Sequence, residues 1–342
     1  MAMIHVSAPG RGGIVGNPSD IYGGTVVSCT IPSRAEASIS PSPKLIFDIQ
    51  GHYQVIESEA DLEYLPELHF LDVAKAVWRY LRRSEFAVRG LIDPRATFLV
   101  RATSNIPLKA GCAGSTAMLM CVLAGVLALF DIELTPYELA ELGRAIERHE
   151  LGVHCGYQDQ YMIVFGGLNC VDLRDKEDHA EDREAPWATV EPLAAHVTEL
   201  PFILANTGIQ RHSGAFHAEP RRKWEEGDPR RREGFARLGQ LGRLGKKALL
   251  LRDWDWLGEL MNENWSIVED LIGCGEANNR LIQAARRLGA KGAKLSGAGR
   301  GGTIIALHED PDWLGARLLE KGAALLIRLQ PVAGLTVTRL NH

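Results

Sequence analysis

Hydrophobic residues recur along this chain with two different spacings, and each spacing predicts a different element. Apolar and polar residues alternate over 35–49 and 96–102, which predicts β-strands. Over 68–83 the apolar residues fall three or four positions apart with charged residues between them, which predicts an amphipathic helix. The segment 117–130 is apolar throughout its 14 residues. It is too short to span a bilayer and therefore predicts a buried helix.

Local start and stop signals predict further elements. Thr135 and Pro136, followed by Glu138, are typical of a helix start, and Gly152 should end that helix. We also expect strands at 166–173, 200–206 and 303–307, and helices at 250–272 and 278–288.

Two charged segments bear on the organisation of the chain. Residues 174–187 are almost wholly charged or small, so we expect an exposed connection and a domain boundary there, with domains over 1–185 and 186–342. Residues 219–247 hold ten Lys and Arg against five Asp and Glu. This segment is either a solvated helical pair with mixed charges or a basic patch, and we favour the helical pair.

Composition and charge exclude several classes of protein. A chain that is 46% hydrophobic and 24% charged is too apolar to be disordered. Its net charge of −5 argues against a general nucleic-acid binder, which needs a basic surplus. The six cysteines form no CxxC pair, and the N-terminus lacks the apolar region of a signal peptide. We therefore expect a cytoplasmic protein with reduced thiols and no membrane partner. We also expect a monomer or homodimer.

Candidate chemistry begins with the glycine-rich segment 106–117, IPLKAGCAGSTA, which directly precedes the predicted buried helix. A loop of small residues lets backbone N–H groups close around an anion, and the positive end of the helix dipole faces that anion. Ser115 and Thr116 add hydroxyls where a nucleotide phosphate or its magnesium would lie. The segment is neither a Walker A loop nor a GxGxxG fingerprint. It is a phosphate loop or a tight turn before a buried helix.

Two more segments share this glycine-rich character. Residues 294–302, KLSGAGRGG, lead into the predicted strand at 303–307 and form either a strand-entry turn or a loop that a ligand can approach closely. Residues 8–24, APGRGGIVGNPSDIYGG, carry a cation, a carboxylate, an amide and a phenol among glycines. That mixture suits recognition of a polar small molecule, although an ordinary surface loop would read the same way.

A pair of carboxylates lies between these segments in the sequence. Glu147 falls near the end of the helix that starts at Pro136, and Asp159 follows a glycine turn twelve residues later. Such acids can meet at one metal-phosphate site, where one holds magnesium and the other orients or deprotonates a hydroxyl nucleophile. Each could instead be a solvated carboxylate.

Taken in order, the segments resemble the motifs of the GHMP kinases, which include galactokinase and the homoserine, mevalonate and phosphomevalonate kinases. PGRGGIVGNPSDIYGG is similar to their first motif, PGRxxxxGxxxDYxGG, and IPLKAGCAGSTA to the second, PxxxGLGSSA. KLSGAGRGGT resembles the third, KxxGAGxGGC, and CGYQDQY resembles the galactokinase segment CGIMDQ. The resemblance extends from Pro9 to Leu307.

The resemblance implies an α+β fold of two domains that binds ATP, Mg²⁺ and a small-molecule substrate between them. It implies that Asp159 is the catalytic aspartate, that Arg11 steadies the transferring phosphoryl group, and that Ser115 and Glu147 hold Mg²⁺. The nucleotide-binding residues it implies are Lys109, Gly111, Cys112, Ala113, Gly114, Ser115, Thr116, Gly297 and Gly299. The substrate-binding residues it implies are Asn17, Asp20, Tyr22, Gly156, Gln158, Thr207, Arg211 and His212.

The chain departs from the family patterns at three places. Ile21 separates Asp20 from Tyr22, Ala113–Gly114 replaces a Gly–Ser pair in the second motif, and Thr303 replaces the cysteine of the third. The substrate role of Tyr22 and the metal role of Ser115 rest on the positions next to these departures.

Two sugar-kinase branches of the family compete. GNPSD at 16–20 is similar to plant-type glucuronokinases. YQDQYMIVFGGLN at 157–169 and NTGIQRHSG at 206–214 resemble the bacterial heptose 7-phosphate kinases. Both branches imply phosphorylation of an anomeric hydroxyl, and we favour D-glycero-D-manno-heptose 7-phosphate, converted to the 1,7-bisphosphate on the way to nucleotide-activated heptose for surface polysaccharide. Glucuronate, galactose and mannose are the alternatives, and a non-catalytic binding module with this fold is the rival from another class.

Overall fold

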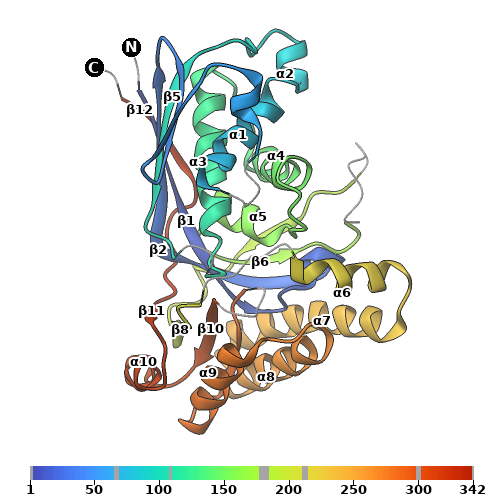
Figure 1. Ribbon diagram of the computed structural model, residues 1–342. Helices are drawn as coiled ribbons and strands as arrows, with labels where there is room; N and C mark the ends of the chain where they lie inside the picture. Colours follow the sequence, from blue (N-terminus) through green and yellow to red (C-terminus); the bar gives the residue numbers. More distant parts are fainter. Residues whose placement is uncertain are drawn as a thin grey trace.

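The computed structural model describes residues 3–64, 69–107, 110–176, 185–209, 215–297 and 302–340, with the backbone alone over 215–218. Two β-sheets with their helices make up this part of the chain (Figure 1). The larger sheet has the strand order β12-β1-β2-β5-β3-β4. Strand β6 pairs with the N-terminal part of the long strand β2, and β7 pairs with β6. All its pairings are antiparallel except that of β3 with β5. The strands of this sheet are β1 (Met3–Val15), β2 (Thr25–Pro41), β3 (Leu45–Ile49), β4 (His52–Ile56), β5 (Phe98–Ser104), β6 (Leu168–Asp172), β7 (Thr189–Pro192) and β12 (Thr336–Leu340).

Helix α3 (Gly114–Leu129) packs against β1 and β2 and is buried on nearly all sides. This burial explains its composition, since a helix surrounded by other elements has no polar face. Helices α1, α4 and α5 lie around it on one face of the larger sheet (Figure 1). The remaining helices of this half are α1 (Phe70–Leu81), α2 (Glu85–Val88), α4 (Pro136–His149), α5 (Gln158–Phe165) and the short η1 (Ser19–Tyr22) and η2 (Glu59–Leu62).

The second sheet is smaller and wholly antiparallel, with the order β11-β8-β10-β9. Helices α7 and α8 pack on each other; α8 also contacts β9, and α7 also contacts β2 of the larger sheet. Strand β1 likewise contacts both α8 and β10, so the two halves meet along β1 and β2. The elements of this half are β8 (Phe202–Asn206), α6 (Ala215–Glu225), α7 (Pro229–Leu251), α8 (Trp254–Leu271), α9 (Glu276–Arg287), β9 (Gly292–Leu295), β10 (Thr303–Leu307), α10 (Pro311–Glu320) and β11 (Leu325–Ile327).

Most elements predicted from local patterns are present. The helix predicted at 68–83 is α1, and the one predicted from Thr135 is α4, where the hydroxyl of Thr135 accepts a hydrogen bond from the backbone N–H of Glu138. The strand predicted over 35–49 is two strands, because the chain turns back at 42–44 between β2 and β3. The charged segment 219–247 forms the end of α6 and most of α7, which confirms the helical pair.

The glycine-rich segment near the start of the chain differs from the prediction. The surface-loop alternative for 8–24 is wrong for residues up to Val15, which lie in the buried strand β1. Glycines at 10, 12 and 13 leave no apolar alternation to read, yet a Cβ at Gly10 would lie 2.7 Å from the carbonyl oxygen of Cys112. They allow close approach to neighbouring segments rather than a turn.

Two short strands that follow the boundary predicted at 185/186 in the sequence pair with strands that precede it. Strand β7 follows that boundary but pairs with β6, and β12, close to the C-terminus, pairs with β1 over five residues. Both therefore extend the larger sheet. The exposed connection itself falls mostly within 177–184, outside the described residues.

No disulfide joins the cysteines, all six of which lie within the described residues. Over the described residues, no helix is both long enough and apolar enough to cross a membrane.

Candidate active site

The centre of the site is an ion pair between Arg11 on β1 and Asp159 in the first turn of α5. The Nε of Arg11 donates to Oδ1 of Asp159 at 2.7 Å, and Nη2 donates to the same oxygen. Nη1 donates to the carbonyl oxygen of Gly111 at 2.6 Å. Burial alone would lower the pKa of Arg11, but the charge and hydrogen bonds of Asp159 outweigh it and raise that pKa. Arg11 is therefore held as a cation between the aspartate and the glycine loop.

Asp159 keeps one oxygen available for chemistry. Its side chain is 28% exposed against 8% for Arg11. Within the described residues, Oδ1 takes both hydrogen bonds from Arg11 and no donor reaches Oδ2. A carboxylate fixed by one oxygen and open at the other can orient a hydroxyl group and accept its proton.

Asp20 fixes the start of α5 and hence the position of Asp159. Its Oδ2 accepts the backbone N–H groups of Tyr157 and Gln158, each at 3.1 Å. Burial raises the pKa of Asp20 to about 6, although the hydrogen bond from Gln158 opposes that shift. Gly156 makes the contact possible, because a Cβ there would lie 2.0 Å from the same Oδ2.

The segment from Ala110 to Thr116 forms a turn into α3, as the phosphate-loop interpretation requires. Gly111 has φ +77° and Ala113 has φ +62°, so the chain passes through the left-handed region immediately before the helix begins at Gly114. Among residues 112–116 only Ser115 is exposed. The exposed start of a long helix presents N–H groups and a positive dipole end to an anion.

The third glycine segment packs directly on this loop. A Cβ at Gly297 would lie 2.8 Å from both Cα and O of Gly111, and one at Gly302 would lie 2.6 Å from the carbonyl oxygen of Ala110. The hydroxyl of Thr303 donates to that same carbonyl at 2.8 Å. The second and third motifs thus form one wall. Lys109 and Gly299 lie outside the described residues.

Glu147 lies deeper, behind the loop. Its Oε1 accepts from the hydroxyl of Thr116 at 2.8 Å, and its Oε2 accepts from Nε2 of Gln160 at 2.5 Å. Burial raises its pKa to about 7, and the negative charge of Asp159 adds to that shift.

The surroundings of Glu147 fit a hard divalent cation. Among the described residues no donor reaches the buried Oε1 of Gln160, and Ser115 is exposed one position before Thr116. Carboxylate, amide and hydroxyl oxygens are the donors that Mg²⁺ prefers. The described residues contain no cluster of three His, Cys, Asp or Glu side chains, so phosphate and water oxygens would supply much of the coordination shell.

Several predicted substrate residues are engaged in packing. The side chain of Asn17 bonds to β9, and its Oδ1 accepts from Nζ of Lys294. Tyr22 stacks on Phe235 of α7 with ring centroids 3.7 Å apart. These contacts tie Asn17 and Tyr22 to the second half of the chain, and their roles toward a substrate stay predictions.

The other predicted substrate residues are also placed by the structure where it describes them. Nε2 of Gln158 donates to the hydroxyl of Ser28 at 2.5 Å, and Thr207 donates to the carbonyl of Gly302. Arg211 and His212 lie outside the described residues.

The sequence alone indicated no role for two buried side chains, although both lie inside the glycine-rich or acidic motifs. Gln160 follows Asp159 directly and bonds to Glu147. Lys294 opens the third motif and bonds to Asn17. Their place next to residues already singled out was the available signal.

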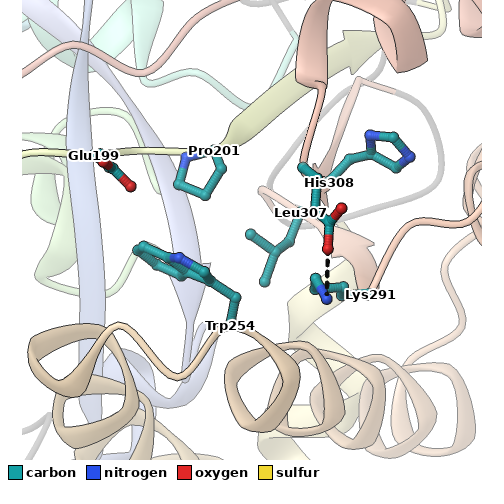
Figure 2. A pocket seen from close by; sticks show the side chains of 7 residues that line it. Glu199, Pro201, Trp254, Lys291, Leu307 and His308 are labelled. Atoms are coloured by element: carbon teal, nitrogen blue, oxygen red, sulfur yellow. Dashed lines mark ion pairs between the residues drawn. The ribbon is translucent and has the colours of Figure 1, made fainter.

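A small cavity of about 220 Å³ lies at the other end of the second sheet, where β8 begins and β10 ends (Figure 2). Trp254, Lys291 and His308 line it, and none of the predicted site residues does. The cavity is separate from the Arg11–Asp159 site.

Comparison with known proteins gives the family. The family model "GHMP kinases N terminal domain" matches residues 72–167, which include the glycine loop, Glu147 and Asp159. The family model "GHMP kinases C terminal" matches residues 246–314. Among curated relatives, glucuronokinase 1 of Arabidopsis thaliana is 27% identical over 94% of this chain and 90% of its own length. The D-glycero-alpha-D-manno-heptose 7-phosphate kinase of Campylobacter jejuni is 27% identical over 89% of each chain.

A solved structure supports the same assignment at the level of the fold. The galactokinase of Lactococcus lactis superposes with a TM-score of 0.78 at 17% identity, covering 98% of this chain and 95% of its own. The chain carries the N-terminal and the C-terminal domain of the GHMP kinases and belongs to that family of kinases.

Proposed function

We propose that this protein transfers the terminal phosphoryl group of ATP to the anomeric hydroxyl of a sugar, with D-glycero-D-manno-heptose 7-phosphate as the substrate. The observation that carries the kinase chemistry is the placement of Arg11, which bonds at once to Asp159 and to the carbonyl of Gly111. It joins a candidate base to the loop that would hold the phosphates.

The mechanism follows from these contacts. The sugar hydroxyl donates a hydrogen bond to Oδ2 of Asp159, which takes its proton as the new oxygen–phosphorus bond forms. The bond between the γ-phosphorus of ATP and the β–γ bridging oxygen breaks in the same step, and ADP leaves. Arg11 fixes Oδ1 and places positive charge beside the reacting groups, where charge moves during transfer. The N–H groups at the start of α3 hold the phosphate chain.

Ser115 and Glu147 would hold Mg²⁺, which neutralises phosphate charge when bound. The hydrogen bonds from Thr116 and Gln160 orient the carboxylate of Glu147 for that role. Burial raises the pKa of Glu147 to about 7, and a nearby cation would oppose that shift by favouring the ionised form.

The choice of sugar rests on two sequence segments and one relative. Residues 157–169 and 206–214 resemble the heptose 7-phosphate kinase pattern, and the Campylobacter jejuni relative carries that name. Arg211 and His212 place a cation and an imidazole beside Ser213, a set that suits a dianionic phosphate.

Glucuronate is the second candidate substrate. The Arabidopsis thaliana relative matches over a slightly larger share of the chain at the same identity. Glucuronate is also anionic, but a single carboxylate demands fewer charged donors than a phosphate.

A substrate panel tests the proposal. ADP release is measured with heptose 7-phosphate, glucuronate, galactose and mannose at equal concentrations, and ³¹P NMR locates the new phosphate. We expect the highest kcat/KM with heptose 7-phosphate and a product phosphorylated at C1. A higher value with glucuronate would transfer the assignment to that sugar. Tight ATP binding without turnover of any sugar would indicate a non-catalytic module.

Arg211→Ala refines the test. If Arg211 holds the substrate phosphate, its loss should weaken binding of the sugar phosphate by about 1.5–3 kcal/mol, the range for hydrogen bonds to charged groups. Turnover of an unphosphorylated sugar should hardly change. Equal losses on both substrates would contradict a role in phosphate recognition.

A further inference from the structure

Lys294, at the centre of β9, is a buried lysine outside the reaction scheme described so far. Its side chain is 1% exposed. Its Nζ donates to Oδ1 of Asn17 at 2.6 Å and to the carbonyl oxygen of Leu295 at 2.6 Å. Both acceptors are neutral, and the described residues give it no ion pair with a carboxylate. Burial lowers its pKa to about 7; the positive charge of Arg11 adds to that shift, and Cys274 opposes it.

Lys291, three residues earlier, shows the ordinary arrangement. It lines the small cavity at the far end of the sheet (Figure 2). Its Nζ pairs there with Glu309 at 3.1 Å and also with Asp255 at 2.5 Å. An ammonium group buried without an acid is costly, so its hydrogen bonds must be well placed. Lys294 is thus the unusual member of this pair.

The contacts of Lys294 lead to the end of strand β1. Asn17 also donates to the carbonyl of Ser296 at 3.3 Å, and the N–H of Gly13 donates to the Ser296 hydroxyl at 3.1 Å. From α8, Asn264 bonds to the N–H of Gly16 and to the carbonyl of Asn17. The segment 13–17 is therefore fastened to β9 and α8 by buried hydrogen bonds.

These contacts close a ring around the candidate active site. Arg11 precedes Gly13 by two residues on β1 and bonds to Gly111. Gly111 packs against Gly297, which follows Ser296 on the chain from Lys294. A shift of Lys294 would therefore displace the end of β1 and the third glycine segment together.

We propose that Lys294 is a positioning residue for phosphoryl transfer, which holds Asn17 and the end of β1 against the third glycine segment and so keeps Arg11 aligned with Asp159 and Gly111. This inference rests on the proposed kinase function for its effect on rate. Its effect on the Arg11–Asp159 pair does not depend on the identity of the substrate.

Lys294→Met tests the proposal, because methionine has similar length and no donor. Lys291→Met is the matched control, since it makes the same change three residues away at a charged surface cavity. We expect kcat to fall at least about tenfold in Lys294→Met, with the ATP dissociation constant changed less than about threefold. Lys291→Met should retain the kcat of the unmodified enzyme. Unchanged kcat per folded molecule in Lys294→Met would overturn the proposal.

A second measurement needs no turnover. NMR of protein labelled with ¹⁵N at arginine Nε reports hydrogen exchange of the Arg11 N–H that bonds to Asp159. We expect this exchange to accelerate at least about tenfold in Lys294→Met and to stay unchanged in Lys291→Met. An unaltered rate in both would refute the positioning role even if no sugar were turned over. If the unmodified enzyme turned over no sugar, that result would instead refute the proposed function.

Ser296→Ala serves if Lys294→Met does not fold. It removes the acceptor for the N–H of Gly13 but leaves Lys294 in place. The same two measurements should change in the same direction by smaller factors. No change in either measurement would contradict the ring of contacts.

Discussion

Single residues at this site are defined by what each oxygen or nitrogen already holds. Arg11 donates three hydrogen bonds, two to Asp159 and one to Gly111. One carboxylate oxygen of Asp20 accepts hydrogen bonds from two backbone N–H groups. The family resemblance implies that Asp20 binds the substrate. Its observed contacts instead hold the helix that carries Asp159, and its role toward substrate stays a prediction.

The raised pKa of Asp20 predicts a particular dependence of stability on pH. In the folded protein the pKa is about 6, against 3.8 for an ordinary aspartate, so the folded form keeps a proton that the unfolded chain releases between these values. The contribution of Asp20 to the free energy of unfolding is therefore present below about pH 4 and lost as the pH rises through 6, by roughly 3 kcal/mol at most.

Asp20→Asn removes this titration while retaining an acceptor oxygen. Urea unfolding of both proteins from pH 4 to pH 6 should show the original protein losing stability relative to the variant as the pH rises. A constant difference across that range would show that Asp20 does not titrate there.

Helices and strands position these residues, and the start of α5 leaves little room for change. Gly156 precedes the helix and leaves room for Oδ2 of Asp20, which a Cβ would meet at 2.0 Å. In Gly156→Ala either Asp20 or the start of α5 must move, and Asp159 moves with the helix. We expect kcat to fall at least about tenfold and the free energy of unfolding to fall by about 1–3 kcal/mol.

Steady-state kinetics and denaturant unfolding check that expectation. His154→Ala, two residues earlier at an exposed position, is the control and should leave both quantities near those of the unmodified protein. Unchanged kcat in Gly156→Ala would show that the start of α5 tolerates displacement.

Elements with strong local signals were predictable, and those without them were not. Helix α4 follows from Thr135, Pro136 and Glu138, which form a capping box. Helix α5 has no such signal, since its start is held by Asp20, 137 residues away from Tyr157 in the sequence. Strand β1 was hidden because glycines interrupt its alternation.

The candidate site was predictable to the extent that motifs carry it. Arg11 and Asp159 meet, as do Gly111 and Gly297, although each pair is far apart in the sequence. The sequence gives no sign that the side chain of Asn17 bonds to β9, because an amide among glycines suits packing and ligand binding equally well. That distinction depends on Lys294, a partner 277 residues away.

Over the whole molecule, long-range pairing brings the parts together. Strand β12 returns the C-terminal segment to β1, and β7 adds a strand to the larger sheet beyond the charged connection. Five-residue and four-residue strands with exposed side chains carry too weak a pattern for prediction, so their pairing emerges only from the fold. The result is one site assembled from β1, α3, α5 and the segment after β9.

The most direct test of the account compares Asp159→Asn with the unmodified enzyme, in sugar turnover and in ATP binding by calorimetry. Asparagine keeps the shape of the side chain but cannot take a proton from the sugar hydroxyl. We expect kcat to fall by about 100-fold or more, within the range for loss of a general base, while the ATP dissociation constant changes less than about threefold. A near-normal kcat in Asp159→Asn would contradict the central claim that Asp159, held by Arg11, receives the proton during phosphoryl transfer.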